Sequence, residues 1–300
     1  MSVRGVLVAL MMLAASVARA ADAIIADGQY PEGALWYEGR LYYEEMWPNL
    51  VRVSDLSKTR TLWSMPDCGP VNIAPYRGDF VVLCHLGHKL VRVSHEGKTI
   101  EVIDRDSSGR AFVYPNGAVA DGEGGVYFTS SGTFDIKAPA EGAVLYLAAD
   151  GKLTRIAEGI HYANGIAVDH ARNRLLVSAH LAREVLAYPI VARGELGKPS
   201  SFFSFAANMI AAPYPLAGPD GMEIDGAGNV FVAEYGAGRL HKISPDGQWL
   251  GAYTGVGQFV TDMALLPNGR AVITAPRSNS TPPFWGSVTL SERFAERFKK

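Results

Sequence analysis

Six acidic or amide residues recur along the chain, each at the start of a short apolar segment. Successive copies lie about 46 residues apart, which is the spacing of a structural repeat. The six residues are Glu32, Asn72, Asn116, Asn164, Asp220 and Asp262. Carboxylate and amide oxygens, with no lysine or arginine among them, are the donors that hard divalent cations prefer. The pattern predicts an oxygen-rich cation site if the fold brings these side chains together.

The segments that must position these residues have the composition of β-strands. Runs such as 80–83, 126–129 and 230–233 are rich in valine, phenylalanine or tyrosine and are bounded by glycine or aspartate turns. After residue 20, only the short tail 291–300 has a helical pattern. A period near 45 residues, with about four strands in each copy, is typical of a β-propeller blade. We therefore predict an all-β, six-bladed β-propeller that uses residues 21–300 as one domain.

A propeller places the first strand of every blade next to its central axis, so the six recurring residues are expected to face one central, metal-binding channel. Two carboxylates about 4 Å apart repel each other by roughly 4 kcal/mol at an effective dielectric constant of 20, which favours a proton or a cation between them. Ca²⁺ is the first choice, and Zn²⁺, Mn²⁺ and Mg²⁺ stay open. The alternative is that these side chains cap strand ends and bind water.

The predicted rim of this channel mixes aromatic and imidazole groups. In an antiparallel blade, the segment after the second strand returns to the face on which the first strand starts. The residues expected there as substrate contacts are Trp47, His85, Phe134, His180 and Tyr235. This mixture suits a small ligand with polar and apolar parts. His85 and His88 have the spacing of a zinc pair, but no third cysteine or histidine lies near them, so we expect no zinc site there.

Residues 1–20 have the pattern of a cleaved signal peptide. Arg4 supplies the positive start, residues 6–17 form an apolar core, and residues 18–20 fit the small-x-small cleavage rule. We therefore expect a mature chain in a periplasm or in the medium. No later segment approaches about 18 consecutive apolar residues, and a net charge of −2 does not suit a nucleic-acid binder. The expected partner is a small molecule, rather than a nucleic acid or a membrane.

Two further features fit an exported propeller. Cys68 and Cys84 flank the hairpin of the second repeat, and an oxidising compartment would allow a disulfide between them; two buried free thiols are the alternative. The sixth repeat is one outer strand short. We expect residues 23–26, which precede the first repeat, to supply that strand and close the ring.

Three segments carry a family resemblance: Pro-Glu-Gly-Ala-Leu-Trp at 31–36, Tyr-Ala-Asn-Gly-Ile-Ala-Val-Asp at 162–169 and Gly-Pro-Asp-Gly-Met-Glu-Ile-Asp at 218–225. They resemble the gluconolactonase/regucalcin-like family, which includes the senescence marker protein. The resemblance covers nearly the whole mature chain. It implies a six-bladed propeller with a divalent cation in its channel, in a family that contains lactonases and organophosphate-cleaving enzymes.

By motif match, the resemblance implies that Glu32, Asn164 and Asp220 hold the cation. Asn116 takes a position that supplies a fourth ligand in some members and a substrate contact in others. Sugar-lactone hydrolases of the family often carry an arginine two residues before this asparagine, where the chain has Tyr114. The missing positive charge favours a less polar lactone or another ester-like substrate, with Tyr114 as a substrate contact.

These residues predict a metal-dependent hydrolase, most simply a lactonase that opens a small lactone ring. The cation would polarise the carbonyl and lower the pKa of a water molecule, and Asp220 would accept the proton. Asn116 would position the developing oxyanion, and Asp262, Glu45 and Glu234 are reserve bases. A Gly-x-Ser-x-Gly motif is absent, so a serine-esterase mechanism is not expected. Two alternatives stay open: another metal-dependent hydrolase or lyase, for example on phosphotriesters, and a non-catalytic propeller that binds a ligand.

Overall fold

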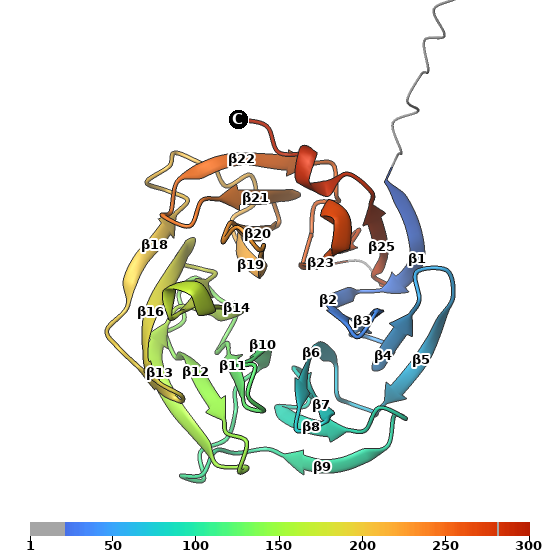
Figure 1. Cartoon of the computed structure of the whole chain (residues 1–300), viewed down its shortest axis with the longest axis vertical. Helices are drawn as coiled ribbons and strands as arrows, with labels where there is room; N and C mark the ends of the chain where they lie inside the picture. Colours follow the sequence, from blue (N-terminus) through green and yellow to red (C-terminus); the bar gives the residue numbers. More distant parts are fainter. Residues whose placement is uncertain (1–21, 281) are drawn as a thin grey trace, which may run out of the picture.

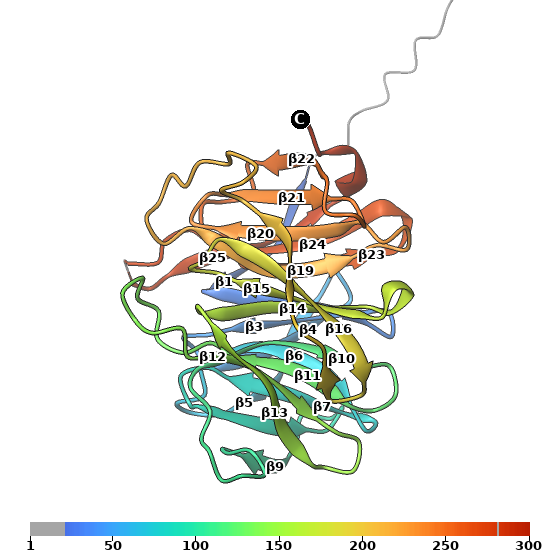
Figure 2. The same ribbon diagram turned by 90° about the vertical axis from the view of Figure 1, so that its left-hand side faces the viewer.

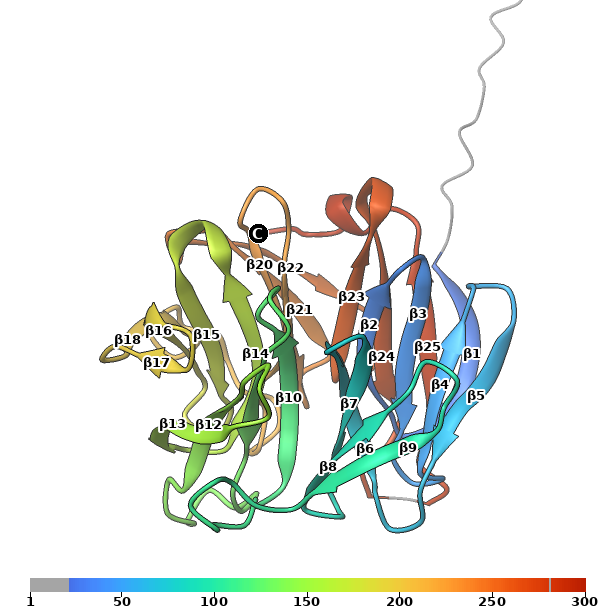
Figure 3. The same cartoon turned by 60° about the horizontal axis from the view of Figure 1, so that its bottom comes forward.

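Six antiparallel sheets stand around a central axis, and each sheet is one blade (Figure 1). The computed structural model describes residues 22–280 and 282–300. Over these residues the predicted all-β, six-bladed propeller is confirmed. The predicted signal peptide, residues 1–20, lies outside them. Figure 3 shows the inner strands standing around the axis, where their first residues can share one channel.

In four blades the strands follow one another outward in chain order, and in the fourth blade both β17 and β18 pair with β16. The first blade contains β2 (Pro31–Tyr37), β3 (Arg40–Glu45), β4 (Leu50–Ser54) and β5 (Thr59–Ser64). The second contains β6 (Pro70–Tyr76), β7 (Asp79–Cys84), β8 (Lys89–Val93) and β9 (Thr99–Ile103). The third contains β10 (Pro115–Ala120), β11 (Val126–Ser130), β12 (Gly142–Leu147) and β13 (Leu153–Ile160). The fourth contains β14 (Ala163–Asp169), β15 (Arg174–Ala179), β16 (Glu184–Ala192), the short β17 (Glu195–Leu196) and β18 (Ser200–Ser204). The fifth contains β19 (Gly218–Ile224), β20 (Val230–Tyr235), β21 (Arg239–Ile243) and β22 (Trp249–Thr254).

The sixth blade is built from both ends of the chain. Its strands are β23 (Asp262–Leu266), β24 (Arg270–Pro276), β25 (Trp285–Ser291) and, outermost, β1 (Ala23–Gln29). β1 pairs antiparallel with β25, from Ala23 opposite Leu290 to Gln29 opposite Trp285. The predicted closure by the N-terminal segment is therefore confirmed, and hydrogen bonds join the start of the chain to its last blade.

In the third and fifth blades, the hairpin between the first and second strands uses an aspartate turn. The Asp121 carboxylate accepts hydrogen bonds from the backbone N–H groups of Glu123 (2.7 Å) and Gly125 (2.9 Å). Asp225 makes the corresponding turn in the fifth blade. A side chain that satisfies the turn amides stabilises a tight connection, which is why aspartate recurs with glycine between the strands.

The apolar core is divided among the contacts between blades. In the described residues, six clusters of buried side chains each join two neighbouring blades. One contains Leu83 of β7 and Phe128 of β11, and another contains Leu41 of β3 and Val272 of β24. Each blade is therefore held from both sides, which makes the inner strands rigid supports for a site on the axis.

Helical structure in the described residues consists of three 3₁₀ turns, η1 (His170–Arg172), η2 (Pro267–Gly269) and η3 (Phe294–Glu296), and no helix there is long and apolar enough to cross a membrane. The tail predicted as a helix forms only η3. Lys299 instead forms an isolated antiparallel bridge with Ala252 of β22. Figure 2 shows the C-terminus near β22. The Phe294 ring packs 5.2 Å from that of Phe231. Tertiary packing thus outweighs the weak helical preference of a short segment.

Cys68 and Cys84 form a disulfide, with their Cα atoms 4.5 Å apart. Of the two alternatives that the sequence left open, the structure has the bonded one. The bridge ties the segment before β6 to the end of β7. It therefore anchors the chain next to His85, one of the predicted substrate contacts.

Candidate active site

Four of the six recurring residues share one cavity at one end of the channel. The cavity has a volume of about 410 Å³, and its lining includes Glu32, Asn116, Asn164 and Asp220. Each of these residues lies near the start of the innermost strand of its blade. The residues that the family resemblance implies as cation ligands are thus brought together, and we call this space the first cavity.

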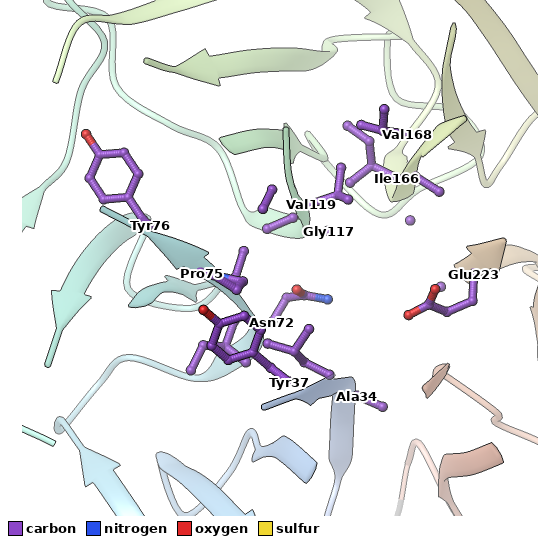
Figure 4. A pocket seen from close by; sticks show the side chains of 18 of the residues that line it. Ala34, Tyr37, Asn72, Pro75, Tyr76, Gly117, Val119, Ile166, Val168 and Glu223 are labelled. Carbon is purple, nitrogen blue, oxygen red and sulfur yellow. The ribbon is translucent and has the colours of Figure 1, made fainter. Parts of the chain in front are cut away.

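Asn72 and Asp262 line a different space, the second cavity, of about 550 Å³. Its other lining residues, such as Gly117 and Glu223, lie further along the inner strands. Figure 4 shows Asn72 and Glu223 pointing into this cavity from opposite sides. The six residues expected around one ion therefore form two sets.

Strand pairing explains why the sets separate. The register between β6 and β7 shifts between Pro70 and Asn72, which makes Val71 the extra residue of a β-bulge. Val71 lines the first cavity, so it takes in the second blade the position that Glu32 takes in the first. Asn72 takes the position at which the four donor-bearing blades have glycine.

Contacts between neighbouring blades identify the same residues as equivalent. Each of the four oxygen-donor residues is followed by a glycine. This glycine either packs against the backbone carbonyl of the equivalent residue in the next blade or donates its backbone N–H to that carbonyl. These pairs are Gly33 with Val71, Gly117 with Asn164, Gly165 with Asp220, and Gly221 with Thr261. Val71 and Thr261 are therefore the true equivalents of the four donors. Asn72 and Asp262 match the recurring residues in polarity, but each lies one residue further along its blade than the four donors do.

For two of the oxygen-donor residues, a hydroxyl group of the preceding blade holds the backbone in place by a hydrogen bond. The Thr129 hydroxyl donates to the Asn164 carbonyl oxygen at 2.7 Å, and the Ser178 hydroxyl donates to the Asp220 carbonyl oxygen at 2.8 Å. Both hydroxyl side chains are fully buried. Because these bonds run between strands of the rigid scaffold, the two donors are held in place before any ligand binds.

The side-chain amide of Asn164 is oriented by His180. His180 is buried, and its Nε2 lies 2.9 Å from the Leu216 carbonyl oxygen, which can only accept a hydrogen bond. Burial lowers the pKa of His180 to about 4, although the Leu216 and Pro219 carbonyls act in the opposite direction. The ring is therefore neutral at neutral pH, with its proton on Nε2 and a free lone pair on Nδ1.

This lone pair decides how Asn164 faces the cavity. The Asn164 Nδ2 atom lies 3.3 Å from His180 Nδ1 and donates to it, since an amide oxygen there would meet a second acceptor. The Asn164 side chain also hydrogen-bonds the Asp220 carboxyl group. With its nitrogen engaged, Asn164 keeps its Oδ1 atom free as an oxygen donor.

The two carboxyl groups of the first cavity are strongly perturbed. Loss of hydration, followed by the nearby charges of Asp220, Asp262 and Glu44, raises the pKa of Glu32 well above its ordinary value. Loss of hydration and the Asp262 charge raise the pKa of Asp220 in the same way. Glu44 pairs with Glu32 across β2 and β3, is fully buried, and has neither carboxyl oxygen hydrogen-bonded within the described residues. The inner end of this blade therefore concentrates negative charge that only a proton or a cation can offset.

Tyr114 and two histidines form one side of the rim. The Tyr114 ring lies 4.9 Å from the His85 ring and 4.4 Å from the His88 ring. His85 Nδ1 donates to the Pro115 carbonyl oxygen at 3.1 Å, next to Asn116. Burial lowers the pKa of His85 to about 4, so this ring is also neutral at neutral pH. His85 and Tyr114 line the first cavity as predicted contacts, and they brace the strand that carries Asn116.

Phe134, His180 and Tyr235 also line the first cavity, but Trp47 does not. The Trp47 ring stacks at 4.9 Å on Phe284 and is 45% exposed. Phe284 lies between Trp47 and the cavity-lining Tyr30, which it meets edge to face at 6.0 Å. Trp47 therefore packs against Phe284 outside the first cavity.

The reserve bases Glu45 and Glu234 are engaged elsewhere. Glu45 pairs with Arg52 at 3.1 Å, and it is absent from the lining of the first cavity. Glu234 is fully buried and pairs with Arg183, Arg239 and His241. These partners outweigh its burial and lower its pKa, so Glu234 is an ionised structural anchor.

The sequence pattern did not predict two tyrosines that line the first cavity. Tyr30 and Tyr162 line it, and each stands two residues before a donor, as Tyr114 does. All three have a positive φ, between 54° and 59°, which turns the chain into the inner strand. The recurring Tyr-x-donor spacing is a signal that could have identified them. Met46, Val71 and Thr133 complete the lining and have no such signal.

The donor chemistry of the site is mixed. Among residues 22–280 and 282–300, no three or more histidine, cysteine, aspartate or glutamate side chains form a group that could hold a metal ion. The first cavity instead combines the carboxylates of Glu32 and Asp220 with the amides of Asn116 and Asn164. Such an oxygen-only set matches Ca²⁺ better than it matches the nitrogen and sulfur ligands typical of zinc.

The chain is similar to several known proteins. The chain is 26% identical over 201 residues to a gluconolactonase of Zymomonas mobilis, a match that covers 63% of this chain and spans only 55% of that protein. It is 26% identical over 241 residues to pentonolactonase XacC of Haloferax volcanii, covering 78% of this chain and 76% of that protein. The structure of a gluconolactonase from Xanthomonas campestris superposes with a TM-score of 0.71 at 20% identity, covering 89% of each chain, and so shares the fold.

The sequence pattern of the SMP-30/Gluconolactonase/LRE-like region matches residues 30–275, from the tyrosine before the first donor to the second strand of the last blade. The match thus includes all four oxygen donors and the six inner strands. The chain therefore belongs to the SMP-30/gluconolactonase/regucalcin family of six-bladed propellers.

Proposed function

We propose that this protein is a divalent-cation-dependent hydrolase that opens a small lactone ring. The observation that carries the proposal is the first cavity, where four oxygen donors from four blades converge under a rim of aromatic and imidazole groups. Its volume of about 410 Å³ suits a small molecule. The lactonase activities named for two of its relatives support the reaction class.

The four donors fit a hard divalent cation. Glu32 is partly buried and Asp220 is buried, and the ionised forms of both are disfavoured without a positive charge beside them, as their raised pKa values indicate. Asn116 and Asn164 add neutral oxygens, and His180 leaves the Asn164 oxygen free. We assign these four side chains as ligands, with Ca²⁺ as the first choice and Mn²⁺, Mg²⁺ or Zn²⁺ as alternatives.

The chain's own residues then have distinct roles. When bound, the cation would polarise the lactone carbonyl and lower the pKa of a nearby water molecule. Asp220 would accept the proton of the attacking water as general base. Asn116 would stabilise the carbonyl oxygen as negative charge develops on it. The rings of His85 and Tyr114 would hold the substrate beside Asn116.

A panel assay tests this proposal. The protein is stripped with a chelator, reloaded with Ca²⁺, Mn²⁺, Mg²⁺ or Zn²⁺, and assayed on lactones and a phosphotriester. We expect cation-dependent lactone hydrolysis that falls by about 10²- to 10⁴-fold in Asp220→Asn. Asp246→Asn, in an exposed turn of the same blade, should keep full activity.

The possible results separate the functions. Near-wild-type activity of Asp220→Asn would exclude this residue as base. Turnover of the phosphotriester alone would replace the lactonase assignment by a phosphotriesterase. Cation binding without turnover of any compound would favour a ligand-binding propeller.

We also propose that the protein is exported to a periplasm or to the medium. The signal-peptide pattern of residues 1–20 and the disulfide between Cys68 and Cys84 support this proposal, because disulfides persist in oxidising compartments. N-terminal sequencing of the protein from its natural source should begin at Ala21. A mature protein that retains Met1 in the cytoplasm would refute it.

A further inference from the structure

We infer that the substrate is an uncharged lactone with an apolar alkyl or aryl substituent, and that this substituent lies against an aromatic wall formed by Phe134, Tyr162, His180 and Tyr235. The inference rests on the proposed lactonase function and specifies its substrate class. It differs from a sugar lactone, whose ring carries several hydroxyl groups.

The aromatic wall is a continuous surface of the first cavity. The Phe134 ring lies 4.7 Å from Tyr162, 5.3 Å from His180 and 6.5 Å from Tyr235. His180 also contacts both tyrosine rings, at 5.7 and 5.9 Å. All four residues line the cavity. Packed rings of this kind offer apolar area with few free polar atoms, which favours an alkyl or aryl group.

The wall is open to solvent at Phe134. Tyr162, His180 and Tyr235 are buried, whereas Phe134 is 37% exposed on the loop between β11 and β12. A substituent on the wall can therefore extend outward past Phe134. The oxygen donors come from the inner strands, so a bound lactone can direct its carbonyl to them and its substituent to the wall.

The lining has no partner for an anionic substrate. No lysine or arginine is among the residues of the first cavity. The acidic residues of the lining are Glu32 and Asp220, so the chain offers no lysine or arginine side chain to pair with a carboxylate or phosphate on the substrate.

Polar atoms of the aromatic wall are engaged within the protein. The hydroxyl groups of Tyr30 and Tyr235 hydrogen-bond each other at 2.8 Å. Hydroxyl groups of a lactone substituent placed on this wall would lose hydration that the aromatic rings do not replace, and each unpaired hydroxyl there would weaken binding. Each methylene group of a substrate that the wall covers buries apolar area and strengthens binding.

A matched substrate series tests the inference in the cation-loaded protein. The compounds share a six-membered lactone ring: δ-valerolactone, δ-hexalactone, δ-octalactone, δ-decalactone and glucono-1,5-lactone. We expect kcat/KM to rise by about two- to fourfold for each added methylene until the chain reaches solvent. We also expect kcat/KM for δ-decalactone to exceed that for glucono-1,5-lactone by at least about tenfold.

Variants of Phe134 locate the substituent. In Phe134→Ala the ratio of kcat/KM for δ-decalactone to that for δ-valerolactone should fall at least about fivefold. Phe134→Leu should retain most of the ratio, because leucine restores apolar area. Ile136→Ala is the control, since Ile136 is on the same loop, 55% exposed and outside the cavity lining. Circular dichroism and the melting temperature should match wild type in all three variants.

The outcomes distinguish this inference from the function on which it rests. Hydrolysis of glucono-1,5-lactone with a kcat/KM equal to or above the best alkyl lactone would overturn the substrate class and leave the lactonase proposal intact. An unchanged ratio in a folded Phe134→Ala variant would overturn the aromatic wall as the substituent site. Absence of turnover for all five lactones with every cation would overturn the lactonase proposal itself.

Discussion

At the scale of single residues, His180 shows how a neutral side chain can prepare a cation site. The Leu216 carbonyl places the ring proton on Nε2, and the free Nδ1 then takes the amide nitrogen of Asn164. A carbon added at Gly218 would lie 2.1 Å from the His180 carbonyl oxygen and 2.8 Å from its ring, so the next blade confines the histidine. His180 is therefore a positioning residue that acts through Asn164.

The substitution His180→Ala tests this role. Asn164 would be free to present either its nitrogen or its oxygen, so we expect divalent-cation affinity to fall by about 10- to 100-fold. Isothermal titration calorimetry with Ca²⁺ measures the affinity without any assay of activity. His170→Ala, at an exposed position of the same blade, should bind as wild type does. Equal affinities in wild type and His180→Ala would show that His180 does not orient the ligand.

At the scale of elements, the inner strand with its bulge is the unit that places a donor. In the third, fourth and fifth blades, the register between first and second strands shifts across the donor and its following glycine, and in the first blade it shifts directly after Glu32. The bulge turns the donor toward the first cavity. The glycine allows the neighbouring blade to approach closely. An ideal Cβ at Gly165 would lie 2.0 Å from the Asp220 carbonyl oxygen.

Gly165→Ala should therefore push two blades apart. We expect the free energy of unfolding to fall by at least about 2 kcal/mol, because backbone atoms cannot move aside as a flexible side chain could. Gly226→Ala is the matched control, since a Cβ there meets no atom within 4 Å, and its stability should stay within about 1 kcal/mol of wild type. Urea denaturation of both variants measures the difference. Similar losses in the two variants would contradict the close-approach argument.

At the scale of the whole molecule, stability depends on closing the ring. β1 supplies the outermost strand of the last blade and pairs with β25 along its length. Residues Ile25 and Ala26 also pack against the cluster that joins the first and last blades. Without β1, the edge of β25 would be left unpaired.

Deletion of residues 21–28 should lower the melting temperature by more than about 5 °C. A synthetic peptide with the sequence of residues 22–29, added in excess, should recover part of the loss because it can pair with β25. Differential scanning calorimetry measures both effects. A deletion variant that melts as wild type does would refute closure by β1 as a source of stability.

The second cavity makes the stability of the cation-free protein depend on pH. Loss of hydration raises the pKa of Asp262 to about 7, and loss of hydration with the Asp262 charge raises that of Glu223 to about 8. In the unfolded chain both groups have pKa values near 4. From about pH 4 to pH 8 the folded state therefore holds protons that the unfolded state has released, and the free energy of unfolding falls as pH rises.

The double variant Asp262→Asn with Glu223→Gln removes both titrations. In chelator-treated protein, we expect the decline of unfolding free energy between pH 5 and pH 8 to be shallower in the variant than in wild type. Urea denaturation at each pH gives both curves, and the comparison cancels the groups that the proteins share. Parallel curves would mean that these carboxyl groups do not titrate in this range.

Much of this protein follows from residue types at a regular spacing. The β-strand composition and the period of about 46 residues were sufficient to predict six blades, because each blade repeats the same local requirements. The missing outer strand predicted the role of residues 23–26 by simple counting. Glu32, Asn116, Asn164 and Asp220 were identified together because polar side chains at the start of inner strands must face the axis.

The tertiary structure alone decided which polar residues share a cavity. Asn72 and Asp262 match the repeat in residue type, but a bulge and the contacts between blades move them one residue along their strands, and a shift of one residue changes the direction of a strand side chain. Trp47 lies outside the cavity because Phe284, from the last blade, occupies the space in front of it. Packing between segments distant in sequence has no local signature, so the aromatic wall, the orientation of Asn164 and the disulfide became visible only in the folded chain.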